Sequence, residues 1–251
     1  MDATTRRPRV QRIARRRALK RALVTGGTRG IGSAIVTALI ADGFDVMATG
    51  TSPDARVAPG CRYLPCDFTD PASLEAFASK LATDELSVLV NNAGINKVSP
   101  LVDYEPGDFE RIQQVNVIAP FQLCRAVVPG MRKRRYGRIV NIKSIYGLVS
   151  REGRSAYSAS KFGLFGLSRA LALEVARDNI LVNCVAPGIV ETDLTRQVLG
   201  VAGMAEIVTR IPAGRLAQPE EIARYVRFLV SEDNTYLTGQ QIVVDGGYTC
   251  A

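Results

Sequence analysis

Tyr157 and Lys161 are the residues of this chain whose types and spacing could do acid–base chemistry. They lie four positions apart in Tyr157-Ser-Ala-Ser-Lys161, so on a helix both side chains project from the same face. A phenol beside an ammonium group can serve as a proton donor, because the positive charge favours the ionised phenol. The same spacing also occurs on ordinary, partly exposed helix faces, so the two interpretations are separated only by the rest of the chain.

The sequence contains no histidine. This excludes Ser-His-Asp and Cys-His nucleophiles, so that acid–base chemistry has to come from Tyr, Lys, Asp, Glu or Cys. The five cysteines are scattered and include no C-x-x-C pair, which leaves too few ligands for a typical zinc site. We therefore expect no metal, and reduced, mostly buried thiols in a cytoplasmic protein.

Charge and length predict one globular domain that follows a basic arm. The chain has 251 residues, 47% of them hydrophobic, which is enough for a sizeable core. It contains no apolar run long enough for a membrane span. The chain has 32 Lys and Arg, nine of which lie in residues 1–21, and 24 Asp and Glu, one of which lies there. The body therefore has 23 positive and 23 negative side chains. A nucleic-acid partner is therefore not expected for the body. We assign 1–20 to a flexible arm, with contact to an anionic surface as an alternative, and 21–251 to the domain.

The domain begins with a strand, a glycine-rich turn and a helix. Residues 22–25 are apolar, Gly26-Gly-Thr-Arg-Gly30-Ile-Gly32 follows, and a helical pattern continues to about Asp42 before a second strand at 44–48. Glycines at this place let backbone N–H groups of the helix N-terminus approach a diphosphate. The order predicts a βαβ unit that binds a nucleotide.

Several motifs together resemble the short-chain dehydrogenase/reductase family. They are the spacing G-x-x-x-G-x-G with Thr25 before it, Asn91-Asn92-Ala93-Gly94 at the end of a predicted strand (86–90), and Ser144 thirteen residues before Tyr157. The resemblance covers residues 20–251 and is greatest for 3-oxoacyl-acyl carrier protein reductases. It implies an α/β fold, a single doubly wound Rossmann domain with a parallel sheet of about seven strands and helices on both faces.

The resemblance implies the cofactor NADP(H). Residues 49–51 at the end of the second strand include no acid that would repel a 2′-phosphate, and Arg29 in the glycine turn could face one. Both features favour NADPH over NADH. The residues expected to bind the cofactor are Gly26, Thr28, Arg29, Gly30, Ile31, Gly32, Thr51, Asp67, Phe68, Asn92, Ala93, Gly94, Tyr157, Lys161, Pro187, Gly188, Val190 and Thr192.

The family resemblance also assigns the catalytic residues. Tyr157 is the expected acid, Lys161 lowers its pKa and binds the nicotinamide ribose, Ser144 stabilises the substrate oxygen, and Asn116 holds a water that links the lysine to solvent. Lys143 departs from the pattern, since a small or neutral residue is expected before the serine. It either points away from the site or alters the charge preference for the substrate.

The remaining elements are expected in regular alternation. No full helix is expected at 51–60, strands are expected at 61–66, 138–142, 180–186 and within 239–247, and helices at 108–133, at 157–177 and from Pro71 and Pro219. The stretch 191–215 contains three glycines and a proline and is expected to be a loop-rich, mobile lid over the substrate.

The expected function is NADPH-dependent reduction of a ketone to a secondary alcohol, with a 3-oxoacyl thioester of acyl carrier protein or CoA as the preferred substrate. A sugar or other secondary alcohol is one alternative, and a non-catalytic nucleotide-binding protein is another. The resemblance implies a homotetramer and an acidic acyl carrier protein docked on a basic cluster, Arg132, Lys133, Arg134 and Arg135.

Overall fold

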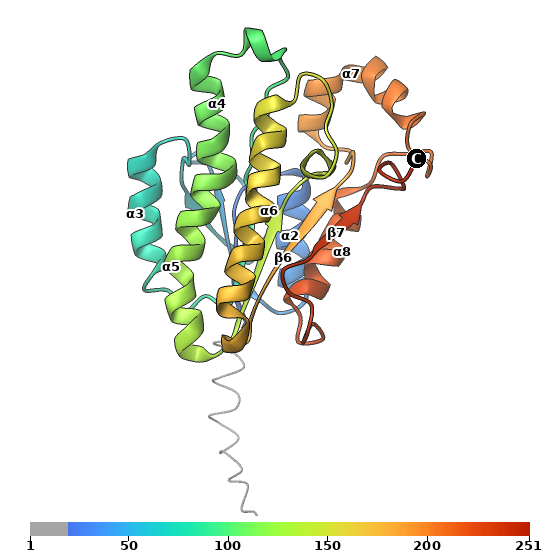
Figure 1. Cartoon of the computed structure of the whole chain (residues 1–251). Coiled ribbons are helices and arrows are strands. Elements are labelled where there is room, and N and C mark those ends of the chain that lie inside the picture. The colour runs from blue at the N-terminus through green and yellow to red at the C-terminus, as the bar shows by residue number, and fades with distance from the viewer. Residues whose placement is uncertain (1–19) are drawn as a thin grey trace, which may run out of the picture.

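The computed structural model describes residues 20–251, and the predicted arm lies outside them apart from Lys20. A seven-stranded sheet with all neighbours parallel has the order β3-β2-β1-β4-β5-β6-β7, as the sequence predicted (Figure 1). Its strands are β1 Arg21–Val24, β2 Asp45–Gly50, β3 Cys61–Pro65, β4 Val88–Asn91, β5 Gly137–Ile142, β6 Ile180–Pro187 and β7 Gln241–Val244. The main helices are α2 Gly30–Ala41, α3 Pro71–Leu81, α4 Pro106–Gln113, α5 Ala119–Arg134, α6 Ser155–Val175, α7 Asp193–Val208 and α8 Pro219–Val230.

The sheet is buried on both faces because helices cover each of them. Successive side chains of a strand point to opposite faces, so Leu23 of β1 joins one apolar core while Val24 joins the other. The first core is closed by α3, α5 and α6, and the second by α2 and α8 (Figure 1). None of the helices in residues 20–251 has the length and apolar character needed to cross a lipid bilayer.

The order of the strands fixes where a ligand can bind. The chain builds β1, β2 and β3 in one direction and then returns to place β4 on the other side of β1. Loops that leave neighbouring strands in opposite directions separate at such a reversal, and a crevice forms beyond the carboxyl ends of the strands. The glycine turn after β1 and the asparagine motif after β4 therefore meet at this edge.

Two predicted stretches differ from the structure. The helix expected over 108–133 is interrupted between α4 and α5 by a π-helical turn, Gln114–Ile118. The lid expected to be loop-rich is mostly helix α7, which is broken at Gly200, where φ is +63°. Glycine is tolerated there because it has no Cβ to clash in this conformation, and the kink divides α7 into two helical segments. As predicted, no helix lies between β2 and β3.

Candidate active site

A cavity of about 510 Å³ lies beyond the carboxyl ends of β1, β2, β4, β5 and β6. All residues predicted to bind the cofactor line it, and so does Ser144. Asn116 is the one predicted catalytic residue that does not. The cavity is therefore formed by stretches that lie as far apart in the sequence as Gly26 and Thr192.

The glycine turn after β1 can be built only from residues without a Cβ at two positions. Gly26 has φ +63°, and a Cβ at Gly32 would lie 2.1 Å from the carbonyl oxygen of Gly26. The turn is also held to β2, because the N–H groups of Gly26 and Gly27 donate to the hydroxyl and the carbonyl of Thr49 at 3.2 and 2.9 Å. The backbone consequently remains open toward the cavity.

Helix α2 begins at Gly30, directly after this turn, and its N-terminus lines the cavity. Its N-cap residue, Arg29, makes no side-chain capping hydrogen bond and is exposed. The first N–H groups of a helix have no partner within the helix and favour an anion. Together with the guanidinium of Arg29 they can hold the phosphates of a nucleotide.

Asn92 and Thr25 fasten the end of β4 to the end of β1. The Asn92 amide nitrogen donates to the carbonyls of Thr25 and Gly26 at 2.9 and 3.0 Å. In return the Thr25 hydroxyl accepts from the backbone N–H groups of Asn92 and Ala93 at 2.9 and 3.0 Å. These four bonds fix the floor of the cavity, where small residues leave room for a flat ligand.

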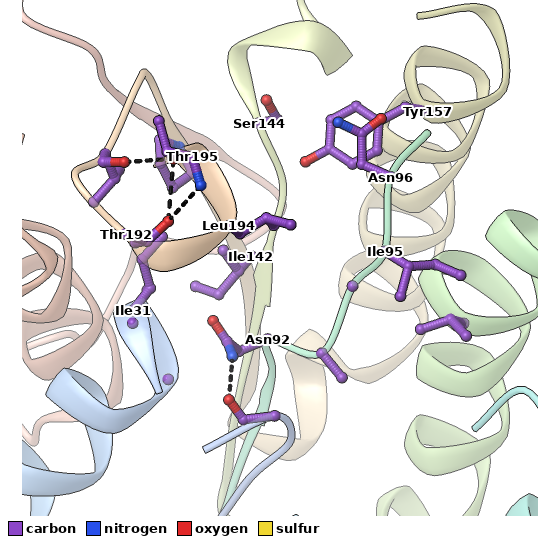
Figure 2. A pocket seen from close by; sticks show the side chains of 18 of the residues that line it. Ile31, Asn92, Ile95, Asn96, Ile142, Ser144, Tyr157, Thr192, Leu194 and Thr195 are labelled. Carbon is purple, nitrogen blue, oxygen red and sulfur yellow. Dashed lines mark hydrogen bonds between the residues drawn. The ribbon is translucent and has the colours of Figure 1, made fainter. Parts of the chain in front are cut away.

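The remaining cofactor positions also line the cavity. Asp67 accepts hydrogen bonds from the N–H and hydroxyl of Thr69 at 2.9 and 2.8 Å, whereas the ring of Phe68 packs edge-on against Phe77 in the core. Thr192, whose side chain lies beside Gly30, caps α7 by accepting from the N–H of Thr195 at 3.2 Å (Figure 2). Thr51, Pro187, Gly188 and Val190 complete the wall.

Tyr157 projects into the cavity from the first turn of α6, and Ser144 lies across from it just beyond β5 (Figure 2). Burial raises the pKa of the Tyr157 hydroxyl above its usual value, while a hydrogen bond with the Ser144 side chain and the charge of Arg154 act in the opposite direction. The two hydroxyls therefore form a pair that can contact one substrate oxygen. Ser144 also accepts from the N–H of Tyr146 at 3.2 Å, which fixes its position.

Lys161 lies one turn after Tyr157 and is 3% exposed. Its ammonium donates to the carbonyl of Ile142 at 3.0 Å and lies 5.5 Å from the centre of the Tyr157 ring. Burial lowers the pKa of Lys161 to about 8; interaction with Cys184 opposes the shift and the charge of Lys143 adds to it. In the chain alone the pKa of Tyr157 is raised, because burial outweighs the Ser144 hydrogen bond and the charge of Arg154. A lowering of this pKa by Lys161 stays a prediction.

Asn116 lies behind the cavity wall, in the π-helical turn, and is fully buried. Its oxygen accepts from the N–H of Ile95 at 2.9 Å, and its nitrogen donates to the carbonyl of Ile95 and the hydroxyl of Ser160, both at 3.0 Å. A Cβ at Gly94 would lie 3.4 Å from both the Asn116 oxygen and the Lys161 nitrogen. Asn116 thus joins the segment after β4 to α6, next to Lys161.

Lys143 lines the cavity, but its ammonium is bonded to groups other than Ser144, Tyr157 and Lys161. Its ammonium donates to the carbonyl of Gly147 at 3.1 Å and to the side chain of Gln241 at 2.5 Å, and lies 4.1 Å from the Phe165 ring centre. The side chain is 2% exposed, and no carboxylate of residues 20–251 pairs with it. Burial lowers its pKa to about 8, against an opposing interaction with Cys184.

The geometry agrees with comparisons to known proteins. The sequence model of a family described as enoyl-(acyl carrier protein) reductase matches residues 26–249. The chain belongs to the short-chain dehydrogenase/reductase family.

Relatives of this family cover nearly the whole chain. The 3-oxoacyl-[acyl-carrier-protein] reductase FabG of Escherichia coli (strain K12) is 42% identical over 236 residues, 91% of this chain and 96% of the relative. The reductase of the same name from Vibrio cholerae serotype O1 is 39% identical over 237 residues, again 91% and 96%. A gluconate 5-dehydrogenase from Burkholderia cenocepacia J2315, solved in complex with NADP and tartrate, has a TM-score of 0.85 at 31% identity and covers 92% of this chain and 96% of its own.

Sequence reasoning missed several polar side chains that line the cavity of this short-chain dehydrogenase/reductase, three of which bear on the site. Asn96, Arg151 and Arg154 all line the cavity. Arg154 precedes Tyr157 by three positions, so helical spacing could have indicated it. Asn96 offered no such signal, because it follows the asparagine motif in a stretch without regular secondary structure.

Proposed function

We propose that this protein is an NADPH-dependent reductase that converts the ketone of a 3-oxoacyl thioester to a secondary alcohol. The observation that carries the proposal is the meeting of Ser144, Tyr157 and Lys161 in the cavity whose other end is the glycine turn. The substrate is supported by the two curated relatives, each a 3-oxoacyl-[acyl-carrier-protein] reductase with about 40% identity over 91% of this chain.

The residues of the cavity fit a dinucleotide. The turn at Gly26 and Gly32 has no space for a Cβ, and the N-terminus of α2 supplies free N–H groups for the phosphates. Arg29 suits a 2′-phosphate, and Val190 and Thr192 lie where the nicotinamide end would be held. When bound, NADPH supplies a hydride to the carbonyl carbon.

The protein's own residues complete the reduction. Ser144 donates a hydrogen bond to the substrate oxygen as negative charge develops there. Tyr157 gives its phenolic proton to that oxygen, and a raised pKa keeps this proton in place at neutral pH. Lys161 stabilises the tyrosinate that remains and can bind the nicotinamide ribose. Asn116 positions Lys161 and is proposed to hold a water through which the proton is replaced.

An acyl carrier protein is proposed to dock at the end of α5. Arg132 and Arg135 are exposed there but share Asp178, at 3.1 and 2.7 Å, and Arg134 donates to the carbonyl of Leu86. This leaves Lys133 as the cluster's exposed cation without a partner in residues 20–251. Charge reversal of Lys133 and Arg135 should slow the reduction of carrier-bound thioesters but not the reduction of CoA thioesters. Equal effects on both would reject the docking patch.

A homotetramer in the cytoplasm completes the proposal. Helices α5 and α6 leave apolar side chains exposed, among them Phe121, Phe162 and Leu173, and Leu173 is 85% exposed. Such a face is stabilised when a second copy covers it. Light scattering of the purified chain and of Leu173→Glu would test this assembly.

A sugar or another secondary alcohol is the second candidate substrate, and similarity to gluconate 5-dehydrogenase supports it. The two are separated by NADPH oxidation with acetoacetyl thioesters beside sugar and diketone substrates. Turnover of thioesters with the highest kcat/KM supports the reductase, and turnover of sugars alone supports the alternative. If NADPH binds and no carbonyl compound is reduced, the chain is a non-catalytic nucleotide-binding protein.

A further inference from the structure

Arg154 is a buried arginine in the wall of the cavity whose guanidinium has, within the described part of the chain, no hydrogen-bond acceptor and no carboxylate partner. Its side chain is 6% exposed and lines the cavity beside Tyr146 and Tyr157. Within residues 20–251 no carboxylate pairs with its guanidinium and no oxygen accepts a hydrogen bond from it. Arg151, by comparison, bonds the Tyr146 hydroxyl and lies 4.0 Å from a carboxylate oxygen of Glu206. A nearly buried guanidinium that lines a cavity and has no anionic partner favours an anionic ligand there.

Arg154 lies close to the groups that would perform the reaction. It is the N-cap residue of α6, three positions before Tyr157, and its guanidinium carbon is 5.3 Å from the Tyr146 ring centre. Its positive charge lowers the pKa of the hydroxyls of Tyr157, Tyr146 and Tyr104 against the larger effect of burial, so it lies among all three. A ligand group bound here would therefore be next to the reacting carbon.

A second polar group without a partner lines the same cavity. The side-chain oxygen of Asn96 is buried and accepts no hydrogen bond. The segment that carries Asn96 is joined to the turn before Arg154, since the N–H of Ser99 donates to the carbonyl of Gly153 at 3.1 Å. Figure 2 shows Asn96 and Tyr157 on one side of the view and Ser144 across from them. This wall is polar, which suits a polar substrate group better than an alkyl chain.

We propose that Arg154 binds the carboxylate of a small oxo acid whose ketone oxygen meets Ser144 and Tyr157, so that the enzyme reduces oxo acids as well as thioesters. The proposal rests on the proposed function, because both substrates use the same site. In the reaction the ketone carbon gains a hydride from NADPH, which becomes NADP⁺, and the oxygen gains the proton of Tyr157. The carboxylate is unchanged, and Tyr157 regains a proton from solvent.

The carbon spacing of acetoacetate explains how one site serves both substrates. In acetoacetate and in an acetoacetyl thioester, the second carbonyl group lies two bonds from the ketone carbon. A carboxylate at that place gains a charge-assisted hydrogen bond from Arg154, whereas the thioester oxygen gains a weaker one. Arg154 is therefore expected to favour the acid over a neutral ester of the same shape.

The test compares acetoacetate with methyl acetoacetate as substrates for NADPH oxidation. Wild-type protein should have the higher kcat/KM for the acid. Arg154→Gln should lower kcat/KM for the acid by about 10- to 100-fold, the value of a hydrogen bond to a charged group, and by less than about threefold for the ester. Arg154→Lys should keep part of the preference. Arg169→Gln removes an exposed cation of α6 outside the cavity and should leave kcat/KM unchanged for both substrates.

Two results would overturn the inference while leaving the proposed function in place. The first is turnover of acetoacetyl thioester without any preference for acetoacetate over its methyl ester. The second is an equal decrease of kcat/KM for acetoacetate and for the ester in Arg154→Gln. A binding measurement needs neither a variant nor turnover. Calorimetry of wild-type protein saturated with NADPH, which cannot take a hydride from an alcohol, should give tighter binding of 3-hydroxybutyrate than of its methyl ester. Equal binding contradicts the anion site even if no ketone is reduced.

Discussion

The ammonium of Lys161 donates a hydrogen bond to the backbone carbonyl of Ile142, 3.0 Å away. This bond joins α6 to the end of β5, where Ser144 follows two residues later. The lysine therefore has a structural partner before any cofactor binds, and its charge is held at the site in a position of low exposure. The first two predictions follow from this buried charge.

Reduction should slow as the pH rises through about 8. Burial lowers the pKa of Lys161 to about 8, so the side chain is positive below this pH and neutral above it. Loss of the charge removes support for the tyrosinate left by proton transfer, whereas Tyr157 itself stays protonated because its pKa is raised. A kcat/KM profile from pH 6 to 10 checks this, and a constant rate up to pH 9.5 would reject it.

Lys143 and Lys161 should each stabilise the fold increasingly as the pH rises from about 8 to 10, whereas the buried thiols of Cys124 and Cys184, whose pKa values burial raises, oppose this trend above about pH 9. Lys143 and Lys161 have a pKa of about 8 in the folded chain and the ordinary value of 10.5 when unfolded. Between these values the unfolded chain binds more protons, so the free energy of unfolding grows by on the order of 1 kcal/mol per pH unit for each lysine. Urea unfolding at pH 7.5 and 9.5 measures the net change, from which a variant of one lysine separates its contribution.

Lys143→Met should remove the contribution of Lys143, so the variant's free energy of unfolding at pH 9.5 relative to pH 7.5 should be lower than in the wild-type protein. Arg138→Met is the matched control. Arg138 is also buried and cationic, but it lies at the start of β5. Burial lowers the pKa of its guanidinium, yet the group stays charged in this pH range. The control should alter stability at both pH values alike. An unchanged slope in Lys143→Met would contradict the role of burial.

Sequence reasoning identified the site residues that are marked by a short motif or by the spacing of neighbours in the chain. Tyr157 and Lys161 were found by helical spacing, and Gly26 by its place between a strand and a helix. It did not reveal the isolation of Arg154, because the absence of a partner depends on every segment that packs around it. The direction of Lys143 was open for the same reason, since Gln241 and Phe165 approach it from β7 and α6.

The same distinction holds for the fold. Alternating apolar strands and helices predicted the parallel sheet, because each strand is buried on both faces. The π-helical turn at Asn116 was not predicted, since it is stabilised by bonds to Ile95 and Ser160 from other parts of the chain. Helix α7 was mistaken for a loop because glycine lowers helix propensity, whereas Ile207 and other apolar side chains of this stretch pack at the cavity.

Gly32→Ala should abolish NADPH binding. The added Cβ would lie 2.1 Å from the Gly26 carbonyl oxygen, so the turn that faces the phosphates has to move. Gly166→Ala is the control, because no atom lies within 4 Å of a Cβ at this position of α6. It should raise stability by up to about 1 kcal/mol and leave binding unchanged. Fluorescence titration with NADPH measures both, and tight binding by Gly32→Ala would exclude the assigned turn.

Arg29→Ala should weaken the binding of NADPH far more than the binding of NADH, because only NADPH carries the 2′-phosphate. A lost charge-assisted contact of this kind reduces affinity about 10- to 100-fold. Arg224→Ala removes an exposed cation of α8 that does not line the cavity, and it should affect neither cofactor. Equal changes in the two affinities of Arg29→Ala would show that the guanidinium does not contact the phosphate.

Tyr157→Phe provides the most direct test of the proposed mechanism. The substitution removes the phenolic proton and keeps the ring in α6, so NADPH should bind with nearly unchanged affinity while kcat for acetoacetyl thioester falls by about 10² to 10⁴. Both quantities are measured on one preparation, by fluorescence titration and by NADPH oxidation. Retention of more than a tenth of the wild-type kcat would show that Tyr157 is not the proton donor.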